Sequence, residues 1–185
     1  MNLPPPLPAA TGFITVLARI SLVLAALGLI WALAQMAAVL ALPDAPLARL
    51  AAQPEIPQGL RWTVQNRYAL ALASLLLAAL GLAVSWGLLK RREWARLGFI
   101  ALLVAGALAN FARLALIGPF FDGLQGMFPA EMLASPDGQR FTAQMQYNRT
   151  VTFATSLLGA LVFAALHGWI VWKLCTAQVR EQFRH

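Results

Sequence analysis

Polar residues divide this chain into four long apolar runs. Each run has the length that a helix needs to cross a hydrocarbon layer, since about 20 apolar residues span roughly 30 Å. The pattern therefore predicts an all-α, polytopic membrane protein whose four transmembrane helices form an antiparallel bundle. The predicted helices lie at about 13–42, 68–89, 97–117 and 151–172, and the outer loops at 43–67 and 118–150.

Prolines and glycines predict the structure between the runs. Asp44 follows Pro43 and can cap a short helix that continues to Leu50. Apolar residues recur at helical spacing over 120–128, which favours a short amphipathic helix in the membrane interface. The sequence Ser135-Pro136-Asp137-Gly138 is typical of a turn, and the proline-rich residues 1–10 are expected to be extended.

Helices two and three are separated by only a few residues around Lys90-Arg91-Arg92. A connection this short joins neighbours that run in opposite directions. We therefore expect an antiparallel helical hairpin.

Composition narrows the class of protein. Hydrophobic residues make up 60% of the chain and charged residues only 11%. Soluble domains carry about 25% charged residues, so a typical soluble domain is excluded. The segments between the runs are short, which favours one membrane domain over 1–185.

The net charge is +7, yet the basic residues gather at helix ends instead of forming the dense stripe typical of a nucleic-acid surface. We therefore expect no nucleic-acid partner. The connection between helices two and three and the C-terminal segment together hold seven basic residues, against five in the longer outer loops, where five acidic residues offset them. The positive-inside bias predicts a multi-pass inner-membrane protein with both termini in the cytoplasm and the two long loops outside.

Candidate chemistry is sparse. The apolar runs hold no Asp or Glu, which disfavours a carboxylate relay. Only His167, His185 and Cys175 offer nitrogen or sulfur to a metal, and His185 is the terminal residue. Because zinc needs three or four ligands, an intramolecular metal site is disfavoured. His167 could be an axial haem ligand or a helix-packing residue, and the lack of a second histidine in the runs favours packing. We expect no catalytic residue, metal or cofactor, and whether the chain is an enzyme stays open.

Polar side chains recur near the predicted outer end of every run. Counted along the helices, they reach one outer level and could form a cationic pocket for a carboxylate or phosphate head group. The alternative is that helix ends are simply polar, with Arg113 paired to Asp122 or Asp44. The residues of the predicted pocket are Gln35, Arg67, Asn110, Arg113 and Arg149.

The segment Leu88-Leu89-Lys90-Arg91-Arg92-Glu93-Trp94-Ala95-Arg96 resembles the basic turn between helices two and three of small, uncharacterised four-span bacterial membrane proteins. The ending Trp172-Lys173-Leu174 and Val179-Arg180-Glu181-Gln182-Phe183 is similar to their amphipathic tails. This resemblance implies a topology and no activity.

The residues of the turn also predict contacts at the inner leaflet. Trp94 suits an interfacial anchor, and Arg91, Arg92 and Arg96 could meet anionic lipid phosphates. In the tail, Val179 and Phe183 share a helical face, which predicts docking on the inner leaflet or on a partner.

Together these patterns predict a non-catalytic accessory or scaffold subunit of a membrane complex, or a homo-oligomer. The alternative is a binder or carrier of a lipid or small anionic amphiphile through the outer cationic pocket. The expected partners are the bilayer with its anionic lipids, other membrane subunits, or a second copy of the chain.

Overall fold

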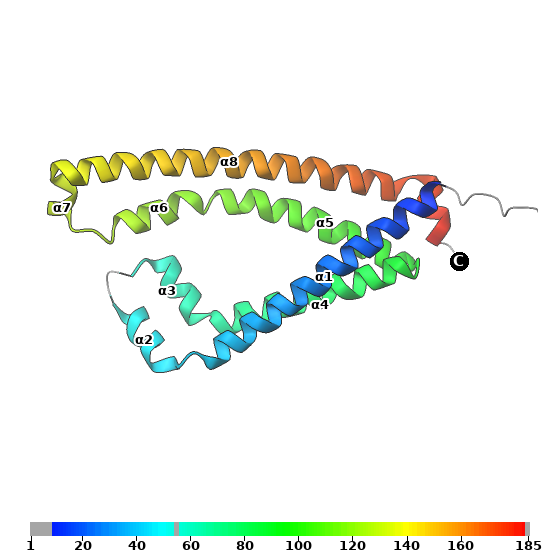
Figure 1. The fold of residues 1–185 in the computed structure, drawn as a ribbon, viewed down its shortest axis with the longest axis horizontal. Coiled ribbons are helices and arrows are strands. Elements are labelled where there is room, and N and C mark those ends of the chain that lie inside the picture. Colours follow the sequence, from blue (N-terminus) through cyan, green and yellow to red (C-terminus); the bar gives the residue numbers. More distant parts are fainter. Residues whose placement is uncertain (1–8, 54–55, 184–185) are drawn as a thin grey trace, which may run out of the picture. The chain divides into compact units, whose positions relative to one another are not determined.

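The computed structural model describes residues 9–53 and 56–183, and every regular element in these ranges is helical (Figure 1). The elements are α1 (Ala9–Ala41), α2 (Asp44–Ala52), α3 (Gln58–Gln65), α4 (Arg67–Leu89), α5 (Glu93–Leu114), α6 (Ile117–Gln125), α7 (Ala130–Ala134), α8 (Pro136–Cys175), α9 (Ala177–Arg180) and the 3-10 turn η1 (Glu181–Phe183). The predicted all-α class is confirmed. Most of the proline-rich leader lies outside the described residues, although Ala9 and Ala10 already belong to α1.

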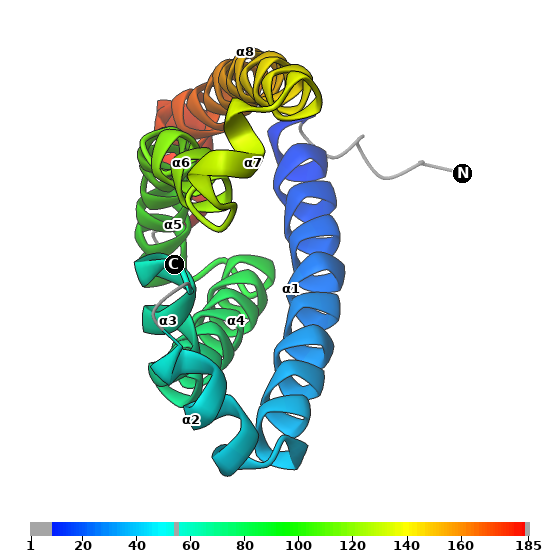
Figure 2. The same ribbon diagram turned by 90° about the vertical axis from the view of Figure 1, so that its left-hand side faces the viewer.

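Four of the helical stretches are long and apolar enough to cross a membrane. They are Gly12–Ala41, Arg67–Leu89, Glu93–Gln125 and Pro136–Cys175. α1 is one unbroken helix in both views of the ribbon (Figures 1 and 2), as expected for a run without internal proline. Within the described residues, the predicted number of long apolar helices and their approximate positions are confirmed. That these helices cross a membrane stays a prediction.

The fourth long helix begins at Pro136, fifteen positions before the predicted start at residue 151. The turn predicted for Ser135-Pro136-Asp137-Gly138 is wrong, because these residues start the helix. Ser135 has extended backbone angles, and its Oγ accepts a hydrogen bond from the Gly138 backbone N–H at 3.0 Å. Pro136 fits the first helical position, where no backbone donor is needed. The same residue types that favour turns thus act as a helix cap.

The predicted outer loops also contain short helices. Asp44 begins α2, which continues to Ala52, and α3 follows as a second helix that the sequence pattern did not predict. The short helix expected within 120–128 is present as α6, although it begins at Ile117. Its location in a membrane interface stays a prediction.

A tight turn over 90–92 joins α4 to α5. The Arg92 N–H donates to the Gly87 carbonyl and the Arg91 N–H to the Leu88 carbonyl, each at 3.0 Å, which is the bonding pattern of a Schellman motif. This motif needs a left-handed residue, usually glycine, and here Arg91 takes that conformation with φ 55°. The predicted helical hairpin is confirmed by contacts along it: a Cβ on Gly98 would lie 3.3 Å from Val84 Cγ2.

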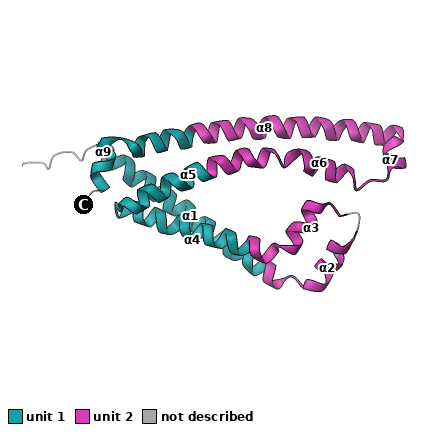
Figure 3. Cartoon of the chain, turned by 180° about the vertical axis from the view of Figure 1, so that it is seen from behind, with its two compact units in different colours: residues 1–38, 71–105, 166–185 teal, residues 39–70, 106–165 magenta. Residues whose placement is uncertain are grey.

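The chain divides into two compact units (Figure 3). Unit 1 consists of residues 1–38, 71–105 and 166–185. Its buried core unites residues that are far apart in the sequence, because α1, α4, α5, the end of α8, α9 and η1 all contribute to it. The core residues are Ile14, Ala18, Val84, Leu88, Ala95, Phe99, Leu174, Val179 and Phe183.

Unit 2 consists of residues 39–70 and 106–165. It holds α2, α3, α6 and α7 together with the adjoining parts of α4, α5 and α8. Its few buried apolar residues are small, and Ala51 and Ala160 are among them. Side chains of this unit are also joined by ion pairs such as Asp44–Arg67 and Asp122–Arg149.

Candidate functional site

The residues of the predicted outer pocket fall into both units. Gln35 belongs to unit 1, where its Oε1 accepts a hydrogen bond from Ser74 Oγ at 3.3 Å. Gln35 thus links α1 to α4. The other four residues belong to unit 2.

Arg67 is ion-paired. Its guanidinium donates to the Asp44 carboxylate of α2 and, at 3.1 Å, to the Val64 carbonyl. Tyr68 Oη donates to the same carboxylate at 2.9 Å, and its ring lies 4.5 Å from Arg67 Cζ. Arg67 therefore anchors α2 to the start of α4, and part of its charge is neutralised.

Asn110 bonds within its own helix, and Arg113 is exposed. Asn110 Nδ2 donates to the Gly106 carbonyl one turn earlier, at 3.0 Å. Arg113 is exposed in the last turn of α5, where a cation stabilises the helix dipole. Its expected pairing with Asp122 or Asp44 is wrong, because each of these carboxylates binds another arginine.

Arg149 of α8 lies against the start of α6. Its Nη1 donates to Asp122 Oδ1 at 2.9 Å, and a Cβ on Gly118 would lie only 2.9 Å from its Nη2. Glycine at position 118 therefore leaves the space that the guanidinium occupies. Both side chains of the ion pair are solvent-accessible, with 47% of Arg149 and 64% of Asp122 exposed.

A cleft of about 470 Å³ opens beside this arginine, between the α5–α6 junction and α8. Its walls are apolar, apart from one guanidinium and one hydroxyl group. The lining residues are Leu114, Ala115, Ile117, Gly118, Pro119, Arg149, Thr150 and Phe153. The arrangement can accept an apolar chain next to a cation.

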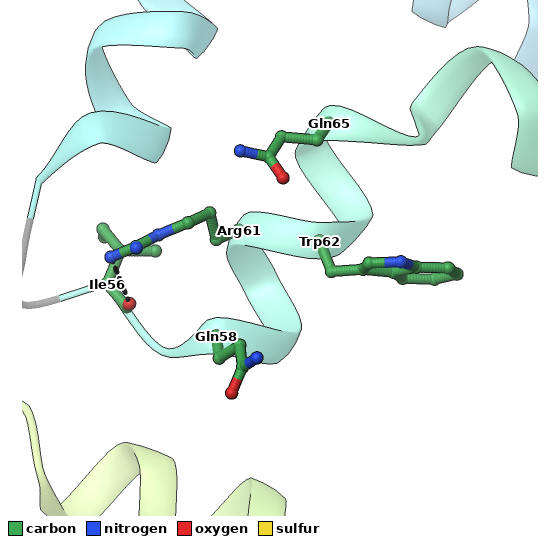
Figure 4. Close-up of a pocket in the computed structure, with 5 residues that line it drawn as sticks. All are labelled: Ile56, Gln58, Arg61, Trp62 and Gln65. Carbon is green, nitrogen blue, oxygen red and sulfur yellow. Dashed lines mark hydrogen bonds between the residues drawn. The ribbon is translucent and has the colours of Figure 1, made fainter.

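A second cleft of unit 2, about 460 Å³, lies along α3 and is more polar (Figure 4). Gln58, Arg61 and Gln65 contribute polar groups to it. Arg61 Nη2 donates to the backbone carbonyls of Gln53 at 3.1 Å and Ile56 at 3.5 Å. Arg61 therefore binds the backbone at Gln53, just after α2, and at Ile56, just before α3.

Unit 1 has an apolar groove of about 630 Å³ between α1 and α4. Alanines provide the small residues in its lining, and leucines and a tryptophan provide the large ones. The lining residues are Leu22, Ala26, Leu29, Ala79, Leu82, Ala83 and Trp86. Small side chains such as these allow another helix or chain to approach closely.

The basic residues predicted to contact the inner leaflet separate into two groups. Arg92 and Trp94 are exposed, so their predicted lipid contact stays a prediction. Arg91 is partly exposed, and its Nη1 donates to Gln182 Oε1 at 2.5 Å. A Cβ on Gly87 would lie 2.8 Å from the Trp94 ring, so this glycine allows the tryptophan to lie against the turn.

Arg96 is buried, with only 7% of its side chain exposed. Its guanidinium donates to both carboxylate oxygens of Glu93, with Nε 3.0 Å from Oε2, and its Nη1 donates to the Leu174 carbonyl at 3.2 Å. That carbonyl lies in the last turn of α8, where backbone acceptors lack helical partners. This burial argues against the lipid contact predicted for Arg96.

The C-terminal tail likewise differs from its prediction. Val179 and Phe183 are each 3% exposed and belong to the core of unit 1. The expected docking of this apolar face on the inner leaflet or on a partner is wrong, because the face is covered by the chain's own helices. The i,i+4 spacing correctly identified the apolar face but could not identify what covers it.

Within residues 9–53 and 56–183, no three His, Cys, Asp or Glu side chains lie close enough to share a metal ion. Sequence reasoning missed both the buried Arg96 site and the cleft at the α5–α6 junction. The Glu93–Arg96 spacing was a readable signal for the ion pair. No comparable signal marks the cleft, because residues of α8 that lie far away in the sequence complete its lining.

No protein family model matches the chain, and no curated protein or solved structure is detectably similar to it. The resemblance of the turn around Lys90–Arg96 to small four-span bacterial proteins therefore stays a prediction.

Proposed function

We propose that this chain is a non-catalytic subunit of a membrane complex that associates with another membrane-spanning helix through the groove between α1 and α4. The groove is the observation that carries the proposal. Ala26, Ala79 and Ala83 lie in its lining, and side chains of this size let helix backbones approach in lipid, where helix packing replaces the hydrophobic effect.

The apolar surface of the spans is compatible with the same proposal. In each span, between 0 and 17% of the most apolar 18-residue stretch is buried. Lipid covers such a surface as readily as protein does, so apolarity alone selects no partner. The groove adds shape, because its lining combines small alanines with large side chains such as Leu22 and Trp86.

We infer further that the four spans form an antiparallel bundle in a bacterial inner membrane, with both termini in the cytoplasm. Supporting this orientation, the α4–α5 turn and the residues after α8 carry the densest positive charge.

The test is affinity purification from native nanodiscs after crosslinking. Replacing Ala83 with Leu adds a bulky side chain to the groove and should remove the co-purified partner. Replacing Ala101 with Leu makes the same change on an exposed position of α5 and should leave the partner bound. Differently tagged copies of the chain distinguish a homo-oligomer from a separate subunit. A monomer without any crosslinked protein, or a partner that both variants retain equally, would contradict the proposal.

A second function, binding of a lipid or small anionic amphiphile, is favoured by one observation. The cleft at the α5–α6 junction places the Arg149 guanidinium beside apolar walls. Lipid binding at this cleft requires only one arginine of the predicted outer pocket, Arg149.

A further inference from the structure

We propose that the cleft at the α5–α6 junction binds a phospholipid with a phosphoethanolamine head group. The inference rests on lipid binding, the second proposed function, and it names the lipid class. In this arrangement the phosphate contacts Arg149, the ammonium contacts Asp122, and one acyl chain lies along the apolar walls.

The level of Arg149 along its helix fits a lipid phosphate. It is followed by 23 uncharged residues, from Thr150 to Trp172. At about 1.5 Å per residue these cover roughly 35 Å of helix, close to the thickness of the hydrocarbon core. Arg149 is therefore the charge at the outer end of the span, where head groups lie. Exposed Tyr147 and Phe120 add the aromatic side chains typical of such a boundary.

The cleft supplies the apolar part of the site. Leu114 and Ile117 line it at the α5–α6 junction, and Phe153 lines it from α8, one turn after Arg149. Phe153 is 45% exposed, so this wall is open to lipid. A volume of about 470 Å³ accommodates a section of an acyl chain next to the guanidinium.

The ion pair determines the head-group chemistry. Arg149 and Asp122 are joined at 2.9 Å, and an ion pair as exposed as this one contributes little to stability. A ligand can therefore open it at little cost. A phosphate without a countercharge would replace Asp122 on the arginine and would lie beside a free carboxylate. A head group with both charges satisfies both side chains.

The ammonium group also distinguishes phosphoethanolamine from phosphocholine and phosphoglycerol. Phosphoethanolamine has N–H groups that can donate to the Asp122 carboxylate. Phosphocholine is also zwitterionic but has no N–H group, and phosphoglycerol has no cation. Charge-assisted hydrogen bonds to a carboxylate are the stronger kind, so we expect ethanolamine to be preferred over choline and glycerol.

Native mass spectrometry tests this preference on the full chain released from nanodiscs that contain equal amounts of the three lipids. The wild-type protein should retain the ethanolamine lipid preferentially. Arg149→Leu should reduce bound ethanolamine lipid about tenfold, the effect of one charge-assisted hydrogen bond. Asp122→Asn should keep phosphate binding but lower the ethanolamine-to-glycerol ratio several-fold. Gly118→Ala should weaken binding without removing a charge, because the new methyl group displaces the guanidinium.

Arg140 and Asp137 provide a matched control. They form an ion pair on α8 at 3.8 Å, both are largely exposed, and neither lines the cleft. Arg140→Leu and Asp137→Asn should therefore leave the lipid ratios unchanged. The helical content of each variant by circular dichroism separates loss of binding from loss of fold, and Arg149→Lys keeps the charge if Arg149→Leu does not fold.

Three results would overturn the inference. One is equal retention of all three lipids by the wild-type protein. Another is an unchanged ratio in folded Asp122→Asn. The third is competition by inorganic phosphate at the same concentration as the lipid, which would indicate an anion site without a lipid. The Ala83→Leu variant should keep the lipid preference, so failure of the partner proposal and failure of this one are distinguishable.

Discussion

Arg96 shows what a single residue can do at the end of a span. Its charge is removed from solvent, yet all of its described partners are acceptors: the Glu93 carboxylate on its own helix and the Leu174 carbonyl at the end of α8. A buried guanidinium is tolerated only when such acceptors surround it. Lysine cannot reproduce this set of hydrogen bonds, because its ammonium group lacks the planar pair of N–H donors of a guanidinium.

Replacing Arg96 with Leu should lower the free energy of unfolding by about 2–4 kcal/mol, because it leaves the Leu174 carbonyl without its donor. Arg96→Lys should recover only part of the loss. Equilibrium unfolding in mixed detergent micelles, followed by circular dichroism, measures both changes. Arg92→Leu removes the same charge from an exposed neighbour and should change stability by less than about 0.5 kcal/mol. Equal losses in the two leucine variants would refute a structural role for Arg96.

At the scale of elements, the short helices after α8 matter most. α9 and η1 are too short to be stable alone. They persist because Val179 and Phe183 enter the core of unit 1 beside Leu88 and Leu174. The stability of the tail therefore depends on the packing of these two side chains.

Phe183→Ala should release this tail, since deletion of a buried phenylalanine ring costs about 3–5 kcal/mol. Trypsin cleavage after Arg180 requires local unfolding, so its rate in detergent should rise by at least tenfold. Phe120→Ala deletes a ring that is 61% exposed and should leave this cleavage rate unchanged. A tail cleaved equally fast in wild type and Phe183→Ala would show that the core does not hold it.

At the scale of the whole chain, the sequence predicted those features of the fold that depend on a local pattern of residues. Apolar run length sets the number of spans, and a three-residue connection sets the hairpin. The Ser135-Pro136 start of α8 was misread because a turn and a helix cap favour the same residues. The cleft at the α5–α6 junction and the docking of Phe183 could not be predicted from the sequence, because each depends on contacts between residues that are distant in the sequence. The expected pocket of five polar residues named Arg149 but not its Asp122 partner.

The orientation of the chain can be tested with its own cysteine. Cys175 is the single cysteine and is exposed at the end of α8, on the side predicted to be cytoplasmic. A membrane-impermeant maleimide should therefore leave it unlabelled in intact cells and label it in inverted vesicles. Moving the thiol, with Cys175→Ser and Ser135→Cys, should reverse the pattern. Labelling of Cys175 from outside intact cells would reverse the assigned sidedness.

The Schellman turn at Arg91 also bears on how the protein enters its membrane. Because so few residues join α4 and α5, neither helix can move far across the membrane independently of the other. α4 and α5 should therefore be inserted together, as one hairpin emerging from the ribosome. Removal of the positive charges of the turn should then reverse the orientation of both helices together, and not that of one helix alone.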